Sequence, residues 1–272
     1  MGGTNPLTAS TLNNSGTIEG GTIGVGHDGS ETLILTNSGT IKAGLGAFLG
    51  GGNAIDYIAN TGWLVGQVSL GDGDDFYSGA AGRLIGKLFA NAGNDNVVGG
   101  VDNDWFEGGA DNDALAGNGG ADTLLGQDGK DMLNGGFGYD KLDGGNGSDT
   151  LIGGAGKDDL TGGTNNDYFV FNTALNASTN LDRIIDFSHA DDTLRVENAV
   201  FTKLGAGAGA HALNPAFFRA GTKALDGNDY IVYNRATGIV SYDNDGNGAH
   251  AVIAFAYLPF KPVLAANDFV VI

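Results

Sequence analysis

Residues 90–170 read ANAGNDNVV, GGVDNDWFE, GGADNDALA, GNGGADTLL, GQDGKDMLN, GGFGYDKLD, GGNGSDTLI, GGAGKDDLT and GGTNNDYFV, nine rows of nine residues without an insertion. The sixth residue of every row is aspartate, the eighth is apolar, and the first is glycine from the second row onward. Three columns that stay in phase over this length indicate an internal structural repeat. The nine aspartates are Asp95, Asp104, Asp113, Asp122, Asp131, Asp140, Asp149, Asp158 and Asp167.

The columns predict how one row folds. Glycine at positions one, two and four permits left-handed backbone, so the first six residues are expected to form a turn. Positions seven to nine are expected to form a three-residue strand whose middle side chain faces the core. One buried residue per row builds a core only when rows stack, so the pattern predicts an all-β, parallel β-solenoid. With two rows per coil, the aspartates fall into two columns, one containing Asp95, Asp113, Asp131, Asp149 and Asp167 and the other Asp104, Asp122, Asp140 and Asp158.

Electrostatics indicate a need for cations. Coils stack about 4.8 Å apart, so aspartates repeated at that interval repel one another. Residues 90–170 contain 15 acidic residues against 3 lysines. A donor set of carboxylates and turn carbonyls, without His or Cys, selects Ca²⁺ over transition metals and Mg²⁺. A bare acidic solenoid or a disordered Gly/Asp linker are the alternatives.

The rows resemble the GGxGxDxUx consensus of the RTX (repeats-in-toxin) family. The resemblance implies a calcium β-roll in which each ion lies between rows i and i+2, bound by the position-six aspartate and by turn carbonyls. Nine rows would then hold about seven Ca²⁺ ions. The nine aspartates above are therefore candidate metal ligands.

Repetition continues upstream, over residues 1–89. Asn14-Ser-Gly-Thr-Ile, Asn37-Ser-Gly-Thr-Ile and Asn60-Thr-Gly-Trp-Leu recur at 23-residue intervals and resemble the repeats of bacterial surface β-helices. They predict larger coils of an N-terminal β-solenoid. Two segments already resemble the later rows, GGNAIDYIA with Asp56 and SLGDGDDFY with Asp75. Asp75 is a tenth candidate ligand, and Asp56 is less favoured.

Residues 171–272 lose the period and are expected to form a C-terminal β-rich cap domain, because an open solenoid end exposes strand edges. Strands are predicted in the apolar runs near 181–187, 193–196, 230–233, 238–242 and 251–255, and a helical turn at Pro215. The region resembles the C-terminus of serralysin-type proteins, which implies a type I secretion signal ending in Asp268-Phe-Val-Val-Ile. A last β-strand of the cap is the alternative for that ending.

One further motif, Asp243-Asn-Asp-Gly-Asn-Gly, matches the opening of an EF-hand loop, but Ala254 stands where the bidentate Glu belongs. A hairpin turn is the favoured interpretation, and a weak extra Ca²⁺ site is the alternative.

Composition excludes several function classes. A net charge of −19 opposes nucleic acid and anionic membrane surfaces, and no apolar run is long enough for membrane insertion. The chain has no Cys, no G-x-S-x-G motif, and four histidines (His27, His189, His211 and His250) outside any H-E-x-x-H motif. We therefore expect no enzyme activity, although a polysaccharide-modifying site in residues 1–89 stays open.

These features predict a secreted, extracellular protein that folds on binding Ca²⁺ outside the cell, with association to the cell surface left open. Two function classes fit: a structural surface, matrix or adhesin component, or the C-terminal folding and secretion module of a larger extracellular protease or polysaccharide-modifying enzyme. Expected partners are calcium ions, the type I secretion apparatus, and either a polysaccharide or further copies of the chain. Outward-facing Trp105 and Tyr168 are candidate contact residues.

Overall fold

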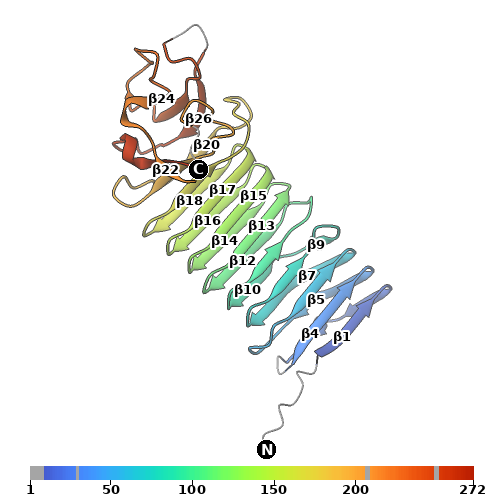
Figure 1. The fold of residues 1–272 in the computed structure, drawn as a ribbon. Coiled ribbons are helices and arrows are strands. Elements are labelled where there is room, and N and C mark those ends of the chain that lie inside the picture. Colours follow the sequence, from blue (N-terminus) through green and yellow to red (C-terminus); the bar gives the residue numbers. More distant parts are fainter. Residues whose placement is uncertain (1–8, 29–30, 206–208, 248–250) are drawn as a thin grey trace, which may run out of the picture. The chain divides into compact units, whose positions relative to one another are not determined.

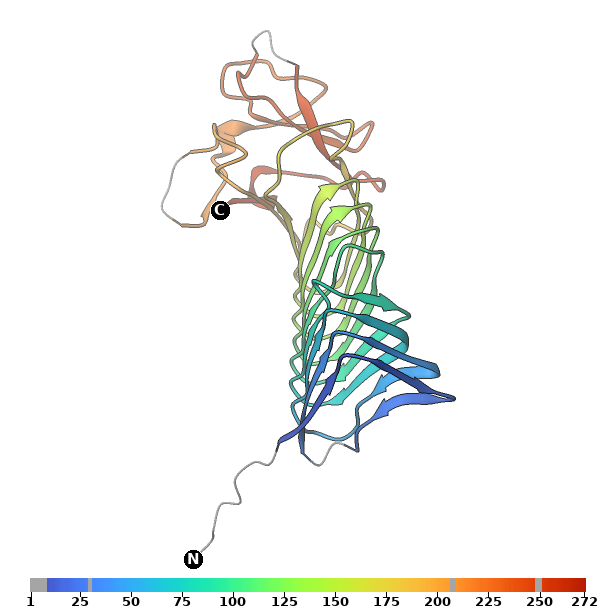
Figure 2. The same ribbon diagram turned by 90° about the vertical axis from the view of Figure 1, so that its right-hand side faces the viewer.

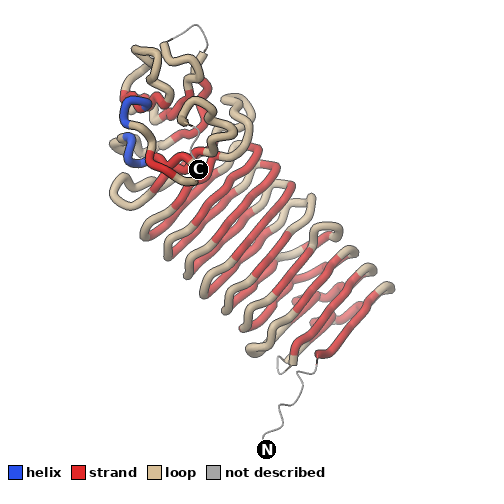
Figure 3. Tube along the Cα trace, in the orientation of Figure 1, coloured by secondary structure: helices blue, strands red, loops and turns tan. Residues whose placement is uncertain are grey.

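The computed structural model describes residues 9–28, 31–205, 209–247 and 251–272. The chain divides into two compact units, Met1–Leu133 and Asn134–Ile272. In the described residues nearly all regular structure is β, and Figure 3 shows two short 3₁₀ turns in blue, η1 (Pro215–Phe217) and η2 (Ala266–Asp268). The predicted all-β fold is confirmed. No helix in the described parts of the chain is both long and apolar enough to cross a bilayer.

The first unit is a parallel β-solenoid, in which the chain alternates between two sheets (Figure 1). One sheet has the spatial order β1 (Ala9–Asn14), β4 (Thr32–Asn37), β6 (Tyr57–Asn60), β8 (Phe76–Ser78), β11 (Asn96–Val98) and β13 (Ala114–Gly119). The other has the order β2 (Thr17–Gly20), β5 (Thr40–Leu49), β7 (Trp63–Asp72), β10 (Leu88–Ala92), β12 (Trp105–Ala110) and β14 (Thr123–Asp128). β3 (Ile23–Gly26) pairs with β5, and β9 (Arg83–Ile85) pairs with β7. β15 (Met132–Gly138) contains the boundary between the units.

The coils of this unit shorten along the chain. The number of residues per coil can be read from residues that pair in successive strands. Ile34 pairs with Tyr57, and Tyr57 pairs with Phe76. Phe76 then pairs with Asn96, and Asn96 with Ala114. The sequence separation between paired residues is largest at the start of this series and smallest at its end. There it equals two nine-residue rows, as the repeat predicts. In Figure 2 the blue coils of this unit are correspondingly wider than the green ones.

A ladder of buried asparagines explains the 23-residue repeat. The Nδ2 of Asn14 donates to Oδ1 of Asn37 at 2.8 Å, and Nδ2 of Asn37 donates to Oδ1 of Asn60 at 2.7 Å. Asn60 in turn donates to the carbonyl of Arg83 at 3.1 Å. Each buried amide thus satisfies the next without any net charge.

The core of the repeat rows is the column at position eight, as predicted. All nine of these side chains are at most 1% exposed: Val97, Phe106, Leu115, Leu124, Leu133, Leu142, Leu151, Leu160 and Phe169. The predicted three-residue strand holds for β11 (Asn96–Val98) but is too short for the rows that follow. β12 runs from position seven of one row to position three of the next, because Gly109 and Ala110 continue the parallel pairing with Gln127 and Asp128. The turn is correspondingly shorter than six residues.

The second unit begins as parallel strands and ends in antiparallel ones. Its first series is β17 (Thr150–Gly156), β19 (Tyr168–Phe171), β21 (Thr193–Val196), β27 (Phe269–Val271) and β22 (His211–Ala212). Its second series is β16 (Lys141–Asn146), β18 (Asp159–Thr164), β20 (Asp182–Ile184), β26 (Ile253–Tyr257), β25 (Ile239–Tyr242), β24 (Ile231–Asn234) and β23 (Phe218–Ala220). β22 is antiparallel to β27, and β25 is antiparallel to both β24 and β26. The antiparallel strands interrupt the parallel stacking, and β23 at the end of the second series is again parallel to β24.

Local predictions for this unit also hold. Asn214 accepts a hydrogen bond from the Ala216 N–H in front of the 3₁₀ turn at Pro215. β25 and β26 form the predicted hairpin around Asp243. The closing segment Phe269–Val271 is a parallel strand on β21, which matches the alternative given for that ending and leaves the secretion signal a prediction.

Candidate metal centre

The position-six aspartates form hydrogen-bonded ladders. In each, the backbone N–H of one aspartate donates to Oδ1 of the aspartate one coil later. In the first unit the pairs are Asp75 to Asp95 at 2.7 Å, Asp95 to Asp113 at 2.8 Å, Asp113 to Asp131 at 2.8 Å, and Asp104 to Asp122 at 2.7 Å. In the second unit they are Asp140 to Asp158 and Asp149 to Asp167, both at 2.9 Å. Within each unit the structure therefore places the predicted residues in ladders, with the 18-residue spacing of two rows except between Asp75 and Asp95, which are 20 residues apart.

The second oxygen of these carboxylates is the more informative atom. Oδ2 of Asp75, Asp95, Asp113, Asp158 and Asp167 is buried and has no hydrogen-bond partner among the described residues. A buried carboxylate oxygen without a donor is costly, and native proteins satisfy such atoms. A cation is the natural partner, because the oxygen carries negative charge and can only accept.

The carboxylates face the inside of the coil. A Cβ built on Gly108, at position one of its row, would lie 2.9 Å from Cγ of Asp113 and 2.9 Å from the carbonyl oxygen of Gly126. Glycine at position one therefore makes room for the carboxylate, a role that differs from the turn formation predicted for it. The aspartates are consequently buried, at 0–7% exposure.

Burial changes the proton affinity of these groups. It raises the pKa of Asp113 to about 8 and that of Asp75, Asp95 and Asp167 to about 7. The negative charge of neighbouring aspartates adds to the effect, for example Asp95 and Asp131 around Asp113. In this environment a carboxylate needs either a proton or a cation.

The donor set fits a hard cation. Among the described residues no three His, Cys, Asp or Glu side chains gather closely enough to hold a metal by themselves. Any ion between the coils would therefore also use backbone carbonyls. One such carbonyl lies close to the next coil, because a Cβ on Gly129 would collide with the carbonyl oxygen of Asp111, one coil earlier. Carboxylate and carbonyl oxygens on a flexible turn suit Ca²⁺.

Three further aspartates extend the ladders beyond the predicted residues. The N–H of Asp56 donates to Asp75 at 2.7 Å, that of Asp158 to Asp182 at 3.2 Å, and that of Asp167 to Asp192 at 3.1 Å. Burial raises the pKa of Asp182 to about 8, and the charge of Asp158 adds to it. The available signal was the Asp-x-apolar triplet, which Asp182-Arg-Ile and Asp192-Thr-Leu share with the rows.

The sequence also drew attention to the hairpin motif at Asp243 and to the histidines. In the hairpin, the Asp245 N–H donates to Oδ1 of Asp243 at 3.2 Å, and Gly248 of that motif lies outside the described residues. Nδ1 of His27 lies 3.3 Å from Oδ2 of Asp56, and Nδ1 of His189 lies 2.6 Å from Oδ1 of Asp268. His250 is also outside the described residues.

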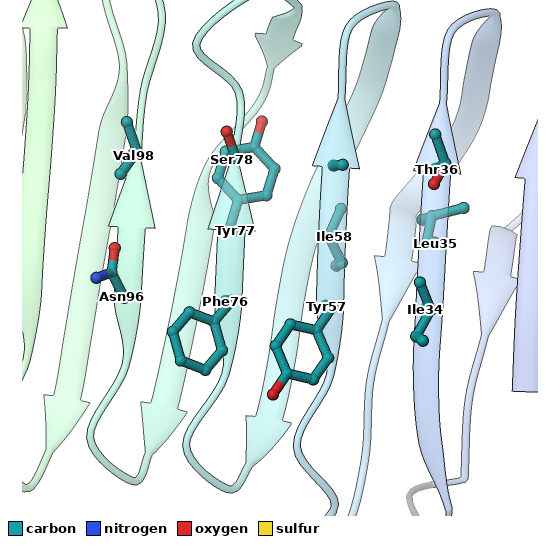
Figure 4. A pocket seen from close by; sticks show the side chains of 11 residues that line it. Ile34, Leu35, Thr36, Tyr57, Ile58, Phe76, Tyr77, Ser78, Asn96 and Val98 are labelled. Carbon is teal, nitrogen blue, oxygen red and sulfur yellow. The ribbon is translucent and has the colours of Figure 1, made fainter. Parts of the chain in front are cut away.

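The outer face of the first unit carries a groove of about 270 Å³ across β4, β6, β8 and β11 (Figure 4). The rings of Tyr57 and Phe76 lie parallel there, with centroids 5.0 Å apart and planes at 5°. Each of these residues is 42% exposed, and none of the described residues lining the groove is charged. Figure 4 shows both rings face-on, beside Ile34.

The aromatic residues singled out from the sequence are less open. The Lys87 ammonium lies 3.7 Å from the ring centroid of Trp105, and the Arg195 guanidinium lies 3.5 Å from that of Tyr168. A cation therefore covers one face of each ring. Tyr57 and Phe76 are more exposed than these two residues.

The repeat rows match a known family model. Residues 89–124, 107–142 and 140–169 match the family model described as RTX calcium-binding nonapeptide repeat (4 copies). No curated protein matches the chain. Among solved structures, the chain is similar to the solution structure of the AlgE6R3 subunit from the Azotobacter vinelandii mannuronan C5-epimerase. The two share 23% sequence identity, with a TM-score of 0.31, over 62% of this chain and 77% of that chain.

Proposed function

We propose that the chain is a secreted protein whose rows fold when they bind Ca²⁺ outside the cell, because residues 89–169 match the family model of the RTX calcium-binding nonapeptide repeat. The observation that carries the proposal is the ladder of buried carboxylates from successive coils, in which Oδ2 atoms such as those of Asp95 and Asp113 lack a hydrogen-bond donor. The predicted ligands are the position-six aspartates and Asp75, with turn carbonyls completing each site.

Calcium concentration would switch the fold. In the low Ca²⁺ of the cytosol, burying a column of carboxylates is opposed by desolvation and by mutual repulsion, so the rows stay open and can pass a type I exporter. Outside, Ca²⁺ near the ~10⁻⁴–10⁻³ M affinities of extracellular modules favours the folded rows, because binding to the folded state alone shifts the equilibrium. The absence of Cys suits a chain that must not form disulfides during export.

The folded chain itself would be the product, as a surface, matrix or adhesin component. Support comes from the first unit, whose carboxylates are buried and joined in ladders. A carboxylate held by Ca²⁺ is not available as a general base.

Calcium titration tests the switch. In chelator, the far-ultraviolet circular dichroism of the purified chain is expected to show low β-content, and addition of Ca²⁺ to about 10 mM, well above the expected affinity, is expected to raise it cooperatively. Mg²⁺ at the same concentration is the control and should have little effect, since it prefers a smaller octahedral site. Equal β-content in chelator and in Ca²⁺ would rule the switch out.

For the partner, we propose an uncharged polysaccharide, bound in the groove at Tyr57 and Phe76. Supporting this choice, two parallel rings offer a flat apolar platform, and the net charge of −19 disfavours anionic polymers.

Truncation of one ring tests this partner. Tyr57→Ala is expected to weaken binding of a soluble neutral β-glucan about tenfold, the equivalent of about 1.4 kcal/mol. Tyr139→Ala is the matched control, because Tyr139 is 66% exposed elsewhere on the chain. Affinity electrophoresis in Ca²⁺ measures the difference. Unchanged retardation of Tyr57→Ala, or a change only in its oligomeric state by size exclusion, would count against the polysaccharide.

A further inference from the structure

Two incomplete rows follow the nine complete ones. In the second unit, Asp159 and Leu160 of β18 pair with Arg183 and Ile184 of β20. This register places residues 180–185 at positions four to nine of a row, with Ile184 at the apolar position eight, where it is 1% exposed. In the same way Phe169 of β19 pairs with Leu194 of β21. Both segments keep the turn aspartate and the strand of a row but lack the glycines that begin a row, and both lie outside residues 89–169.

The first of these segments reproduces the contacts of a complete row. Asp182 occupies position six, is 4% exposed, and accepts a hydrogen bond from the Asp158 N–H at 3.2 Å through Oδ1. Asn180 occupies position four, and its Oδ1 accepts from the Gly156 N–H at 2.9 Å. The incomplete row therefore presents its carboxylate to the preceding coil as a complete row does.

A buried, unsatisfied oxygen lies in the same place. Asp158 is 1% exposed, and its Oδ2 has no hydrogen-bond partner among the described residues. The nearby cation Arg183 does not neutralise the pair, because its Nε and Nη2 are bound to the partly exposed carboxylate of Asp159 at 2.8 and 2.6 Å. Two buried carboxylates consequently share one place without a counter-charge from the protein.

We propose that Asp158 and Asp182 together hold one Ca²⁺ ion, so that the last site of this column is completed by a residue of the C-terminal region. The proposal rests on the proposed function, since it assumes that the complete rows bind Ca²⁺. It ties the folding of the segment that follows the rows to the same ion.

The second incomplete row differs in a way that provides a control. Oδ1 of Asp192 accepts from the Asp167 N–H at 3.1 Å, and Oδ2 accepts from the Ser188 N–H at 2.7 Å. Both oxygens of this carboxylate thus have donors. Asp192 is therefore assigned to closing the turn, not to an ion.

Counting bound ions tests the assignment. The full chain, Asp182→Asn and Asp192→Asn are dialysed against buffered Ca²⁺, and bound Ca²⁺ per chain is measured by atomic emission. Asn keeps the Oδ1 acceptor at both positions, so each variant should fold in Ca²⁺. Asp182→Asn is expected to bind one ion fewer than the full chain, and Asp192→Asn the same number. An unchanged count for Asp182→Asn, or an equal loss in both variants, would overturn the assignment.

Two further outcomes remain decisive. If the unchanged chain binds no Ca²⁺, the proposed function fails. If the unchanged chain binds several ions and Asp182→Asn binds the same number, only this inference fails. If Asp182→Asn does not fold, Asp182→Glu replaces it: the longer carboxylate should keep the count but bind the weakest ion about tenfold less tightly. Equal affinity in that variant would overturn the assignment.

Discussion

Replacement of Phe106 by alanine is expected to lower the free energy of unfolding of the Ca²⁺-loaded chain by about 3–5 kcal/mol. Phe106 is fully buried at position eight of its row, where β12 lies between β10 and β14. Its ring packs edge-on against Tyr77, with centroids 6.3 Å apart. Each row supplies one apolar side chain to the core, so the gap left by this ring has few neighbours that can fill it.

Urea unfolding in saturating Ca²⁺ measures the effect. Phe137→Ala is the matched control, because it makes the same substitution at a side chain that is 74% exposed. The control is expected to change stability by less than about 0.5 kcal/mol. Similar losses in the two variants would show that position eight is not the core.

Acid is expected to substitute for calcium. Without Ca²⁺, the chain should gain β-structure as the pH falls from 8 to 5. Burial raises the pKa of Asp113 to about 8, of Asp95 to about 7 and of Asp104 to about 6, from 3.8. A raised pKa in the folded state means that the carboxylates favour folding when protonated. That contribution is complete below about pH 4 and is lost as the pH rises through 6 to 8.

The direction of the pH dependence reverses when Ca²⁺ is present. The ion binds the ionised carboxylate, so its affinity should increase with pH across the same range. Asp113→Asn separates the two effects: the neutral amide should raise the β-content of the Ca²⁺-free chain at pH 8 and should weaken Ca²⁺ binding. Circular dichroism in calcium-depleted buffers, with Ca²⁺ titrations at pH 5.5 and 8, measures both. A Ca²⁺-free spectrum that does not change between pH 5 and pH 8 would contradict the role assigned to these carboxylates.

Periodicity predicted the parallel fold and the aspartate ladders because each row repeats the same three constraints. Leu115 and Leu124 are buried for the reason visible in the sequence, namely one apolar residue per row. The length of the strands was not predictable in this way. Gly109 was interpreted through its backbone freedom, whereas in the structure it also continues a parallel strand pairing.

Part of the candidate site also escaped prediction. Asp182 and Asp192 occupy position six, but the glycines that mark a row are missing before them, so the period ends earlier than the ladder does. The direction of the carboxylates was likewise hidden. In the structure, the carboxyl group of Asp113 occupies the place where a Cβ of residue 108 would lie. Position one is therefore glycine because any side chain there would collide with this carboxylate.

The asparagine ladder of Asn14, Asn37 and Asn60 has a consequence for refolding. The amides carry no titratable charge, and Oδ1 of Asn37 and Oδ1 of Asn60 already accept hydrogen bonds from the neighbouring amide, so the ladder requires neither a proton nor a calcium ion. The 23-residue coils can therefore serve as a template with the correct strand alignment already set. When calcium returns, the next coil adds to an existing edge, and the slow search for a first pairing is avoided.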